Sequence, residues 1–221
     1  MILVTGFQGY GGRSANPSER VARALDGSRI GGARVQARIL PVDFAAVCRL
    51  MPDMIDAEGP RLILSLGLWP GEPMLRIERM ASNWSWFELP DNAGHRQNGR
   101  VIADGPDGYL TTLPADAMQA AVRAAGLPCR QSGSAGSYLC NATAYVTLHH
   151  CAQRHPATHA GFIHLPYLPA QVAELQDQIA IDGAVEAHQR ADYASMHLDD
   201  MLTGVRAALA AAWTESQAQA T

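Results

Sequence analysis

The chain has 221 residues, of which 48% are hydrophobic and 17% are charged, and its formal net charge is −4 at pH 7. This length suits one well-filled core, and the composition is that of an ordinary globular protein. A weakly acidic chain offers no polyanion-binding surface, so nucleic acid is not expected as a partner. No apolar run approaches the roughly 20 residues that cross a bilayer, and the N-terminal residues lack the basic start of a secretory signal. We therefore expect a cytoplasmic protein with no membrane partner.

The first predicted elements are a buried strand at residues 2–6, a glycine-rich turn, and a helix that begins after Asn16. Asn16 suits the N-cap, Pro17 the first helical position, and Glu19 the reciprocal position of a capping box. Further strand-like runs lie at 33–40, 61–67, 129–133 and 160–166, and helical patterns separate them at 43–58, 114–125 and 140–154.

This alternation of strands and helices predicts an α/β fold. Residues 170–216 are expected to form two helices that complete a single domain over residues 1–216, and residues 217–221 are expected to be a frayed C-terminal tail. The stretch between about 79 and 113 is the least regular part of the chain, and a long excursion of this kind often borders a functional site.

The glycine-rich turn after the first strand does not favour a nucleotide site. Its glycines at 6, 9, 11 and 12 are out of register for G-x-G-x-x-G, and no P-loop lysine follows. A tight strand-to-helix turn explains the glycines, but Phe7 and Tyr10 are placed to wall a small apolar pocket at the carboxyl end of the strand.

The spacing of the cysteines and histidines in the sequence does not predict a metal site. Its four cysteines contain no C-x-x-C pair, so reduced thiols are expected rather than a zinc site or a disulfide framework. Pro156 interrupts the helical pattern between His155 and His159, and His149 and His150 point in different directions on it. These histidines are expected to lie on a solvated helix end.

Two further side chains have both a structural and a functional interpretation. His164 ends an apolar strand, where side chains of α/β sheets face the crevice, although a hydrogen-bonded histidine is also common there. Glu78 alternates with apolar neighbours, so a strand would place it on the same face as Arg76. On its own pattern, Glu78 is expected at the surface.

Cys140 stands where a loop of small residues, 132–137, meets the start of a predicted helix. The sulfur is either inert packing or a nucleophile. At a helix N-terminus the unpaired backbone N–H groups favour thiolate over thiol, and they can also stabilise the oxyanion of a tetrahedral intermediate. With a histidine to exchange the proton and a carboxylate to orient it, such a site supports acyl transfer.

Taken together and in order, the chain's motifs resemble the type I pyroglutamyl peptidases, a family of cysteine peptidases. The segments that carry the resemblance are VTGFQGYGGRSANPS, IERMASN, LPDNAG, DGPDGYLTTLP, SAGSYLCN and GFIHLPYLP. The resemblance implies that Cys140 is the nucleophile, His164 the general base and later acid, and Glu78 the orienting carboxylate. It also implies a single three-layer α/β/α domain with a mixed, partly open sheet, as in phosphorylase-like and hydrolase-like folds.

The implied reaction removes an N-terminal pyroglutamyl residue from a peptide whose N-terminus is blocked, through a thioester acyl-enzyme. By resemblance, the enzyme needs no cofactor and assembles as a homo-oligomer, commonly a tetramer. The side chains implied to surround the lactam ring are Phe7, Tyr10, Leu68, Tyr138 and Leu139.

The chain also departs from the family pattern near this pocket. Gly9 replaces a proline, Leu68 takes the position of a glutamine with Trp69 adding bulk beside it, and Glu88 stands where an arginine is usual. If Glu88 lies close to the thiol, its charge is expected to raise the thiol pKa. These departures leave a second hypothesis open: the chain is a family relative that cleaves another small N-acyl amide. A nucleoside- or phosphate-binding protein on the same fold, with Cys140 merely buried, is the alternative from another class.

Overall fold

The computed structural model describes residues 1–10, 15–182 and 193–218 of the chain. A mixed β-sheet forms its centre. From one edge to the other, the strands of this sheet are β10 (Cys129–Ser132), β5 (Leu75–Glu78), β11 (His159–Leu165), β4 (Leu62–Leu68), β1 (Ile2–Phe7), β3 (Ala33–Leu40) and β2 (Arg29–Ile30). The neighbouring strands β11, β4, β1 and β3 run parallel, whereas β5 pairs antiparallel with β11 and parallel with β10.

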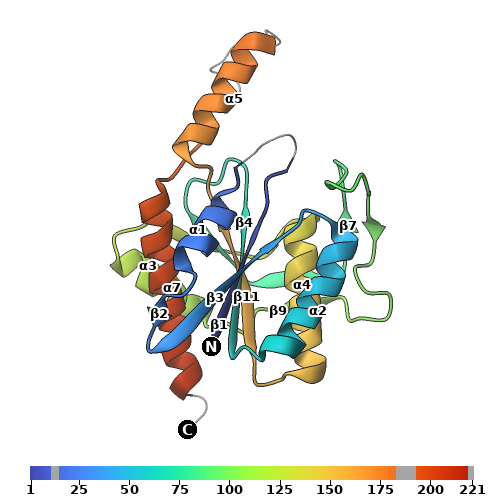
Figure 1. Cartoon of the computed structure of the whole chain (residues 1–221), viewed down its shortest axis with the longest axis vertical. Coiled ribbons are helices and arrows are strands. Elements are labelled where there is room, and N and C mark those ends of the chain that lie inside the picture. The colour runs from blue at the N-terminus through green and yellow to red at the C-terminus, as the bar shows by residue number, and fades with distance from the viewer. Residues whose placement is uncertain (11–14, 183–192, 219–221) are drawn as a thin grey trace.

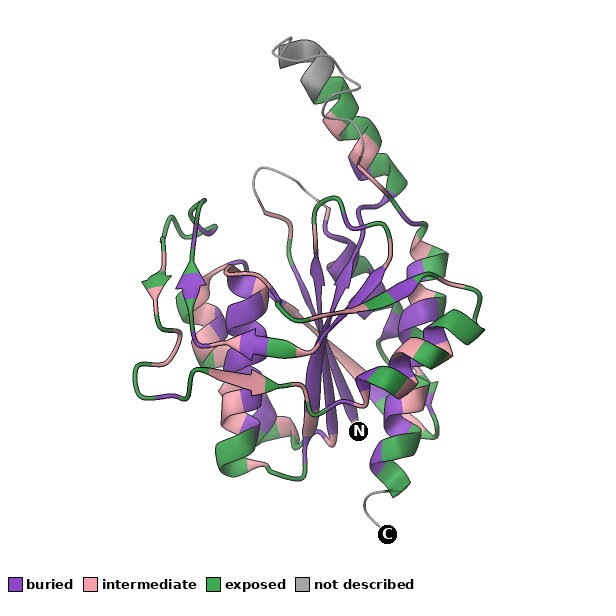
Figure 2. Cartoon of the chain, turned by 180° about the vertical axis from the view of Figure 1, so that it is seen from behind, coloured by how far each residue is buried: buried purple, intermediate pink, exposed green. Residues whose placement is uncertain are grey.

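Helices cover both faces of this sheet (Figure 1). One face carries α1 (Pro17–Leu25), α3 (Ala115–Ala124) and α7 (Leu198–Ala218), and the other carries α2 (Phe44–Glu58) and α4 (Leu139–Arg154). Because side chains alternate between the faces of a strand, Ile2 packs in the first apolar layer and Leu3 in the second. Figure 2 shows the buried strands between the two helical layers, so the predicted three-layer α/β/α fold is confirmed.

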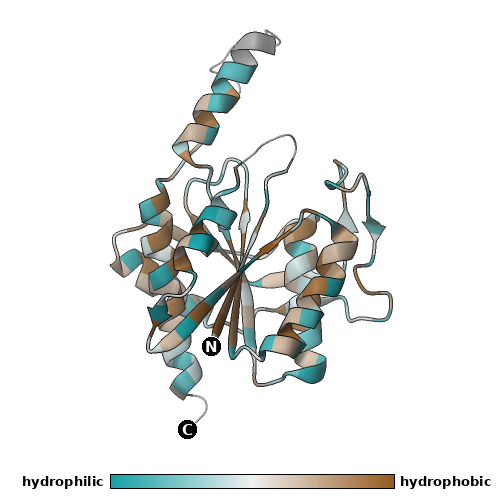
Figure 3. Ribbon diagram, in the orientation of Figure 1, coloured by the Kyte–Doolittle hydropathy of each residue, from teal (hydrophilic) through white to brown (hydrophobic). Residues whose placement is uncertain are grey.

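The hydropathy of the chain follows these layers (Figure 3). The central strands are the most apolar elements, and the helices present their polar residues to the outside. The same pattern explains why the main strands and helices were predictable from apolar periodicity. Among the described residues, no helix combines the length and the apolar character that spanning a bilayer requires.

The irregular stretch contains short strands that the sequence did not predict. Here β6 (Met80–Ser82) pairs with β9 (Gly108–Leu110), and β7 (Ser85–Trp86) pairs with β8 (Asn98–Gly99). Strands of two or three residues are too short to show a period, so only the tertiary structure defines them.

The start of α1 corrects one expectation. Asn16 is the N-cap, and its side chain accepts a hydrogen bond from the backbone N–H of Ser18 at 3.1 Å. Glu19 does not complete a capping box, because its carboxylate instead pairs with Arg23 one turn later at 2.8 Å.

The C-terminal part forms α5 (Pro169–Asp182) and α7, as expected from the sequence. The helix α5 extends away from the sheet and its helical layers (Figure 1). The helix α7 continues to Ala218, two residues past the predicted boundary, and residues 219–221 of the predicted tail lie outside the described residues.

Candidate active site

Cys140 lies in the first turn of α4, half-buried against the central sheet. The N-cap residue Tyr138 has an extended backbone and makes no side-chain capping bond, so the first N–H groups of α4 receive no such partner. The sulfur sits against Gly67 of β4, where an added Cβ would come within 2.7 Å of Sγ. Gly67 is in turn the register partner of His164 on β11, so the fold brings the sulfur to the strand position beside the imidazole.

His164 and Glu78 form a buried pair. His164 Nδ1 lies 2.7 Å from Glu78 Oε1, and the two side chains are 1% and 2% exposed. The antiparallel pairing of β11 with β5 produces this contact, because it sets Phe162 opposite Glu78 and His164 opposite Arg76. The expectation of an exposed Glu78 is therefore wrong. A carboxylate only accepts, so Nδ1 carries the proton and the lone pair falls on Nε2.

A chain of ion pairs continues from Glu78 to the edge of the sheet. Arg76 Nε lies 2.8 Å from Glu78 Oε1, although its N–H is not aligned for a hydrogen bond. Arg76 also pairs with buried Glu72 at 3.5 Å, and Arg130 binds Glu72 with two hydrogen bonds of 2.9 and 2.5 Å. The alternating charges compensate one another, which makes burial of two carboxylates beside the imidazole tolerable.

Trp69 packs over this arrangement. Its ring meets the imidazole of His164 edge-on, with 5.0 Å between ring centroids, and the Arg76 guanidinium lies 3.8 Å from its centroid on the face. On the other side of His164, the ring of Phe162 lies at 4.8 Å. Trp69 thus shields the ion pairs from solvent and closes one side of the site.

Cys140 and His164 open into one pocket with a cavity of about 380 Å³. All five residues that the resemblance implied for lactam binding line it: Phe7, Tyr10, Leu68, Tyr138 and Leu139. Glu88 lines the same pocket, together with Trp69 and Trp86. Glu78 is not among the lining residues, because it lies behind the imidazole.

The protonation state of Cys140 differs from the thiolate that was expected at a helix N-terminus. Burial, with the nearby charge of Glu78, raises the pKa of the Cys140 thiol to about 12, and the backbone N–H of Cys140 only partly offsets this rise. Burial lowers the pKa of His164, although its hydrogen bond to Glu78 acts in the opposite direction. At neutral pH the free site therefore holds a neutral thiol beside a neutral imidazole. The charge that raises the thiol pKa is that of Glu78, whereas Glu88 was the expected source.

Neighbouring polar groups hold the start of α4 in place. Asn141 follows Cys140 and exchanges hydrogen bonds of 2.9 Å with the backbone N–H and C=O of Ser82, and donates another to Trp84 O. The loop before α4 is tied by the backbone bond from Trp86 N to Ser137 O at 2.9 Å. Sequence reasoning did not single out Asn141 or Gly67, because the partner of each lies far away in the chain. Asn141 of α4 bonds Ser82 of β6, and Gly67 of β4 contacts Cys140 of α4.

The geometry agrees with the comparison to known proteins. The model of the pyroglutamyl peptidase family matches residues 1–215. The chain belongs to the pyroglutamyl peptidase family. A pyrrolidone-carboxylate peptidase of Chromobacterium violaceum is 43% identical over 77% of this chain and 79% of the relative. One of Cupriavidus taiwanensis is 37% identical over 96% and 92% of the two chains.

Solved structures agree with these sequence relatives. The crystal structure of pyrrolidone carboxyl peptidase from Pyrococcus furiosus superposes with a TM-score of 0.88 at 36% identity, covering 97% of this chain and 99% of the other. This member of the pyroglutamyl peptidase family is a cysteine-type pyroglutamyl peptidase.

Proposed function

We propose that Cys140 is the nucleophile of this pyroglutamyl peptidase, with His164 as its general base and acid and Glu78 as the residue that orients the imidazole. The single observation that carries this assignment is the 2.7 Å contact from His164 Nδ1 to Glu78, made under a pocket that Cys140 also lines. This contact leaves Nε2 as the proton acceptor.

The high pKa of the thiol, about 12, makes attack and proton transfer a coupled step. His164 Nε2 takes the proton from Cys140 as the sulfur attacks the pyroglutamyl carbonyl carbon. Glu78, which accepts from Nδ1–H, stabilises the imidazolium that forms. In this proposal the first N–H groups of α4, which receive no side-chain capping bond, supply the hydrogen bonds to the oxyanion.

Collapse of the tetrahedral intermediate completes acylation. Nε2–H donates its proton to the leaving amine, the C–N bond breaks, and the shortened peptide departs from a thioester on Cys140. His164 then takes a proton from water as the water oxygen attacks the thioester carbonyl. The C–S bond breaks, Nε2–H returns the proton to the sulfur, and pyroglutamate leaves the free thiol. No step requires a cofactor.

The pocket suits a flat, neutral lactam ring. Its walls are mainly apolar and aromatic, and the ring of Tyr138, which lines it, packs 4.4 Å from the ring of Phe87. Tyr138 is fixed by its hydroxyl, which donates to Pro90 O at 3.1 Å. We propose that Phe7, Tyr10, Leu68, Tyr138 and Leu139 bind the ring, with Leu68 contributing an apolar contact where the family pattern has a glutamine.

The remaining sequence expectations are part of the same proposal. Residues 1–216 form one domain, the substrate is a peptide with a blocked N-terminus, and the enzyme acts in the cytoplasm as a homo-oligomer. The cytoplasm is a reducing compartment, and free thiols support this location. The free thiols are Cys48, Cys129, Cys140 and Cys151. The family resemblance supports oligomerisation.

Hydrolysis of pyroglutamyl-aminomethylcoumarin tests the nucleophile. The Cys140→Ser variant is expected to lose the activity, and Cys48→Ser is the matched control because Cys48 is also half-buried but lies on α2. A mass increase of one pyroglutamyl group on the Cys140 peptide, trapped by rapid acid quenching, would identify the acyl-enzyme. A Cys140→Ser protein that retains the parental rate would contradict the assignment.

The role of Glu78 needs a separate variant. Glu78→Gln keeps the shape but removes the charge, so the imidazolium loses its stabilising partner and kcat is expected to fall by roughly 10³-fold with little change in KM. Unfolding by urea should accompany the assay, since Arg76 loses part of its compensation. An unchanged kcat in the folded variant would argue against this role.

A further inference from the structure

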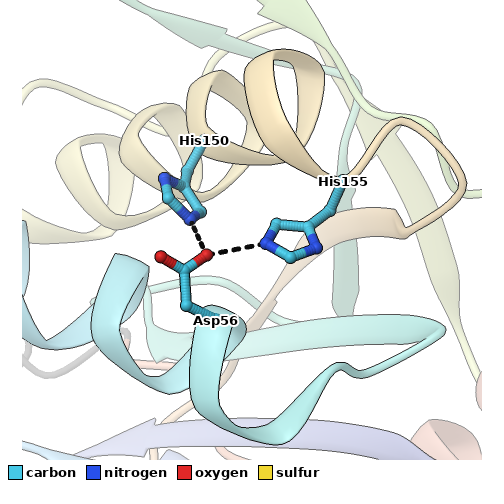
Figure 4. Close-up of side chains that lie close together, drawn as sticks. All are labelled: Asp56, His150 and His155. Carbon is cyan, nitrogen blue, oxygen red and sulfur yellow. Dashed lines mark hydrogen bonds and ion pairs between the residues drawn. The ribbon is translucent and has the colours of Figure 1, made fainter.

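Two histidines and an aspartate meet on the helical layer formed by α2 and α4 (Figure 4). Asp56 lies near the end of α2, His150 in the last part of α4, and His155 at the C-cap of α4. The Nε2 atoms of both histidines lie 2.7 Å from the same oxygen, Oδ1 of Asp56. One potential ligand atom from each residue lies within 4.8 Å of the others.

The sequence pattern did not predict this convergence. Pro156 ends the helical pattern directly after His155, which suggested a solvated helix end. The structure shows that the turn at the end of α4 brings the ring of His155 to 5.5 Å from that of His150, and that α2 supplies Asp56 from a position 94 residues before His150. The two helices pack on each other along one face of the sheet.

The three side chains are fixed by hydrogen bonds to one another and remain partly exposed to solvent. His150 and His155 are 14% and 29% exposed, and Asp56 is 44% exposed. Both histidines share hydrogen bonds with Oδ1 of Asp56, which holds the three side chains together. The nearby charge of Arg154 also acts on Asp56 and opposes a bound cation. Side chains in this state are pre-positioned, yet a solvent molecule can reach them.

This set of donors has the chemistry of a zinc ligand set. Two imidazole nitrogens and one carboxylate oxygen bind Zn²⁺ at about 2.0–2.2 Å, and water takes the fourth tetrahedral position. Oxygen-preferring Mg²⁺ and Ca²⁺ are disfavoured by two nitrogen donors. Both Nε2 atoms converge on one oxygen, to which their N–H groups donate. Zinc binding replaces these hydrogen bonds: each imidazole carries its proton on Nδ1 instead, so that the Nε2 lone pair binds the ion.

We propose that Asp56, His150 and His155 form a zinc-binding site that clamps α2 to α4. His150 is ten residues after Cys140, which corresponds to about 15 Å along the axis of α4. The clamp is therefore separate from the catalytic residues. Its effect is on stability, because an ion that binds the folded chain and not the unfolded one stabilises the fold by mass action.

Zinc titration of the full chain tests this proposal. The protein is stripped with a chelator and carries Cys140→Ser in every sample, so that the active-site thiol does not bind the metal. Calorimetry is expected to show one Zn²⁺ per chain with a micromolar dissociation constant, and Co²⁺ is expected to give visible absorption of a four-coordinate site. Zinc should raise the unfolding temperature, and equal Ca²⁺ or Mg²⁺ should not.

Two ligand variants and one control locate the ion. His150→Gln with His155→Gln, and separately Asp56→Asn, should each raise the dissociation constant about tenfold or more and remove the zinc-dependent rise in unfolding temperature. His197→Gln removes an exposed histidine elsewhere and should change neither. Far-ultraviolet circular dichroism of the metal-free variants checks that they fold.

Two outcomes of these titrations would contradict the zinc site. Zinc affinity that is unchanged in both ligand variants would overturn the proposal, and so would failure of the parent to bind zinc below millimolar concentration. Neither outcome bears on pyroglutamyl peptidase activity, which is assayed with Cys140 intact.

Discussion

Gly67 and Cys140 are in such close contact that a Cβ on Gly67 would clash with the sulfur. An added Cβ would lie 2.7 Å from Sγ and 2.8 Å from Cζ of Phe162. The position of the Cys140 sulfur therefore depends on a glycine within a central strand, where glycine otherwise weakens the sheet.

Gly67→Ala is predicted to displace the sulfur from its position beside His164. Since misplacement of about 1 Å can cost roughly 10²-fold, kcat/KM for pyroglutamyl-aminomethylcoumarin is expected to fall by about that factor. Gly161→Ala is a comparison in the same sheet, because its Cβ would meet Thr111 and Leu113 and not the active site. If both variants fold and lose equal activity, the specific contact with sulfur is not the cause.

The pH profile of kcat/KM is predicted to show one acidic limb and no alkaline loss up to pH 9. His164 must be neutral to act as base. Its pKa is lowered by burial and by Arg76, against the opposing effects of Glu78 and Glu72, so activity should fall only below about 6.5, the ordinary histidine value. The thiol, with a pKa of about 12, stays protonated throughout this range.

Iodoacetamide labelling distinguishes the two protonation states of the free site. For a neutral thiol, the labelling rate of Cys140 should rise steadily with pH between 6 and 9, whereas a thiolate–imidazolium pair would label at a constant rate down to about pH 5. A flat profile would contradict the neutral pair.

Glu88 is predicted to favour substrates with a cationic residue after pyroglutamate. It lines the pocket with its carboxylate exposed, where charge effects are modest. We expect kcat/KM for a pyroglutamyl-arginine peptide to exceed that for a pyroglutamyl-glutamate peptide by roughly two- to fivefold. The isosteric variant Glu88→Gln should bring the ratio towards one, as should high salt. A ratio that is insensitive to both changes would exclude an electrostatic preference.

Loss of the buried carboxylate of Glu72 is predicted to destabilise the fold. Glu72 is buried between Arg76 and Arg130, so Glu72→Ala leaves Arg76 without one of its partners and should cost about 3 kcal/mol in the free energy of unfolding. Glu19→Ala removes a surface pair with exposed Arg23 and should cost less than about 1 kcal/mol. Urea unfolding measures both, and equal losses would mean that burial of the ion pairs does not matter.

Local patterns in the sequence determined the main elements of the fold. The run at residues 33–40 was predicted with the bounds of β3, and the helix expected at 43–58 is α2 to within one residue. Apolar periodicity and N-cap residues are properties of neighbouring positions, so they can be read without the tertiary structure. The ordered motifs also identified the family. The roles of Cys140, His164 and Glu78 and of the five pocket residues follow from the family resemblance and stay predictions.

Contacts between distant segments were decided only by the tertiary structure. Glu78 has the pattern of a surface residue, and its burial follows from the antiparallel pairing of β5 with β11. Burial and the charge of Glu78 raise the pKa of the Cys140 thiol, and they outweigh the lowering effect of the backbone N–H of Cys140. Asp56 joins His150 and His155 because α2 packs against α4. Electrostatic environment is a property of the three-dimensional surroundings, so adjacent letters of the sequence do not contain it.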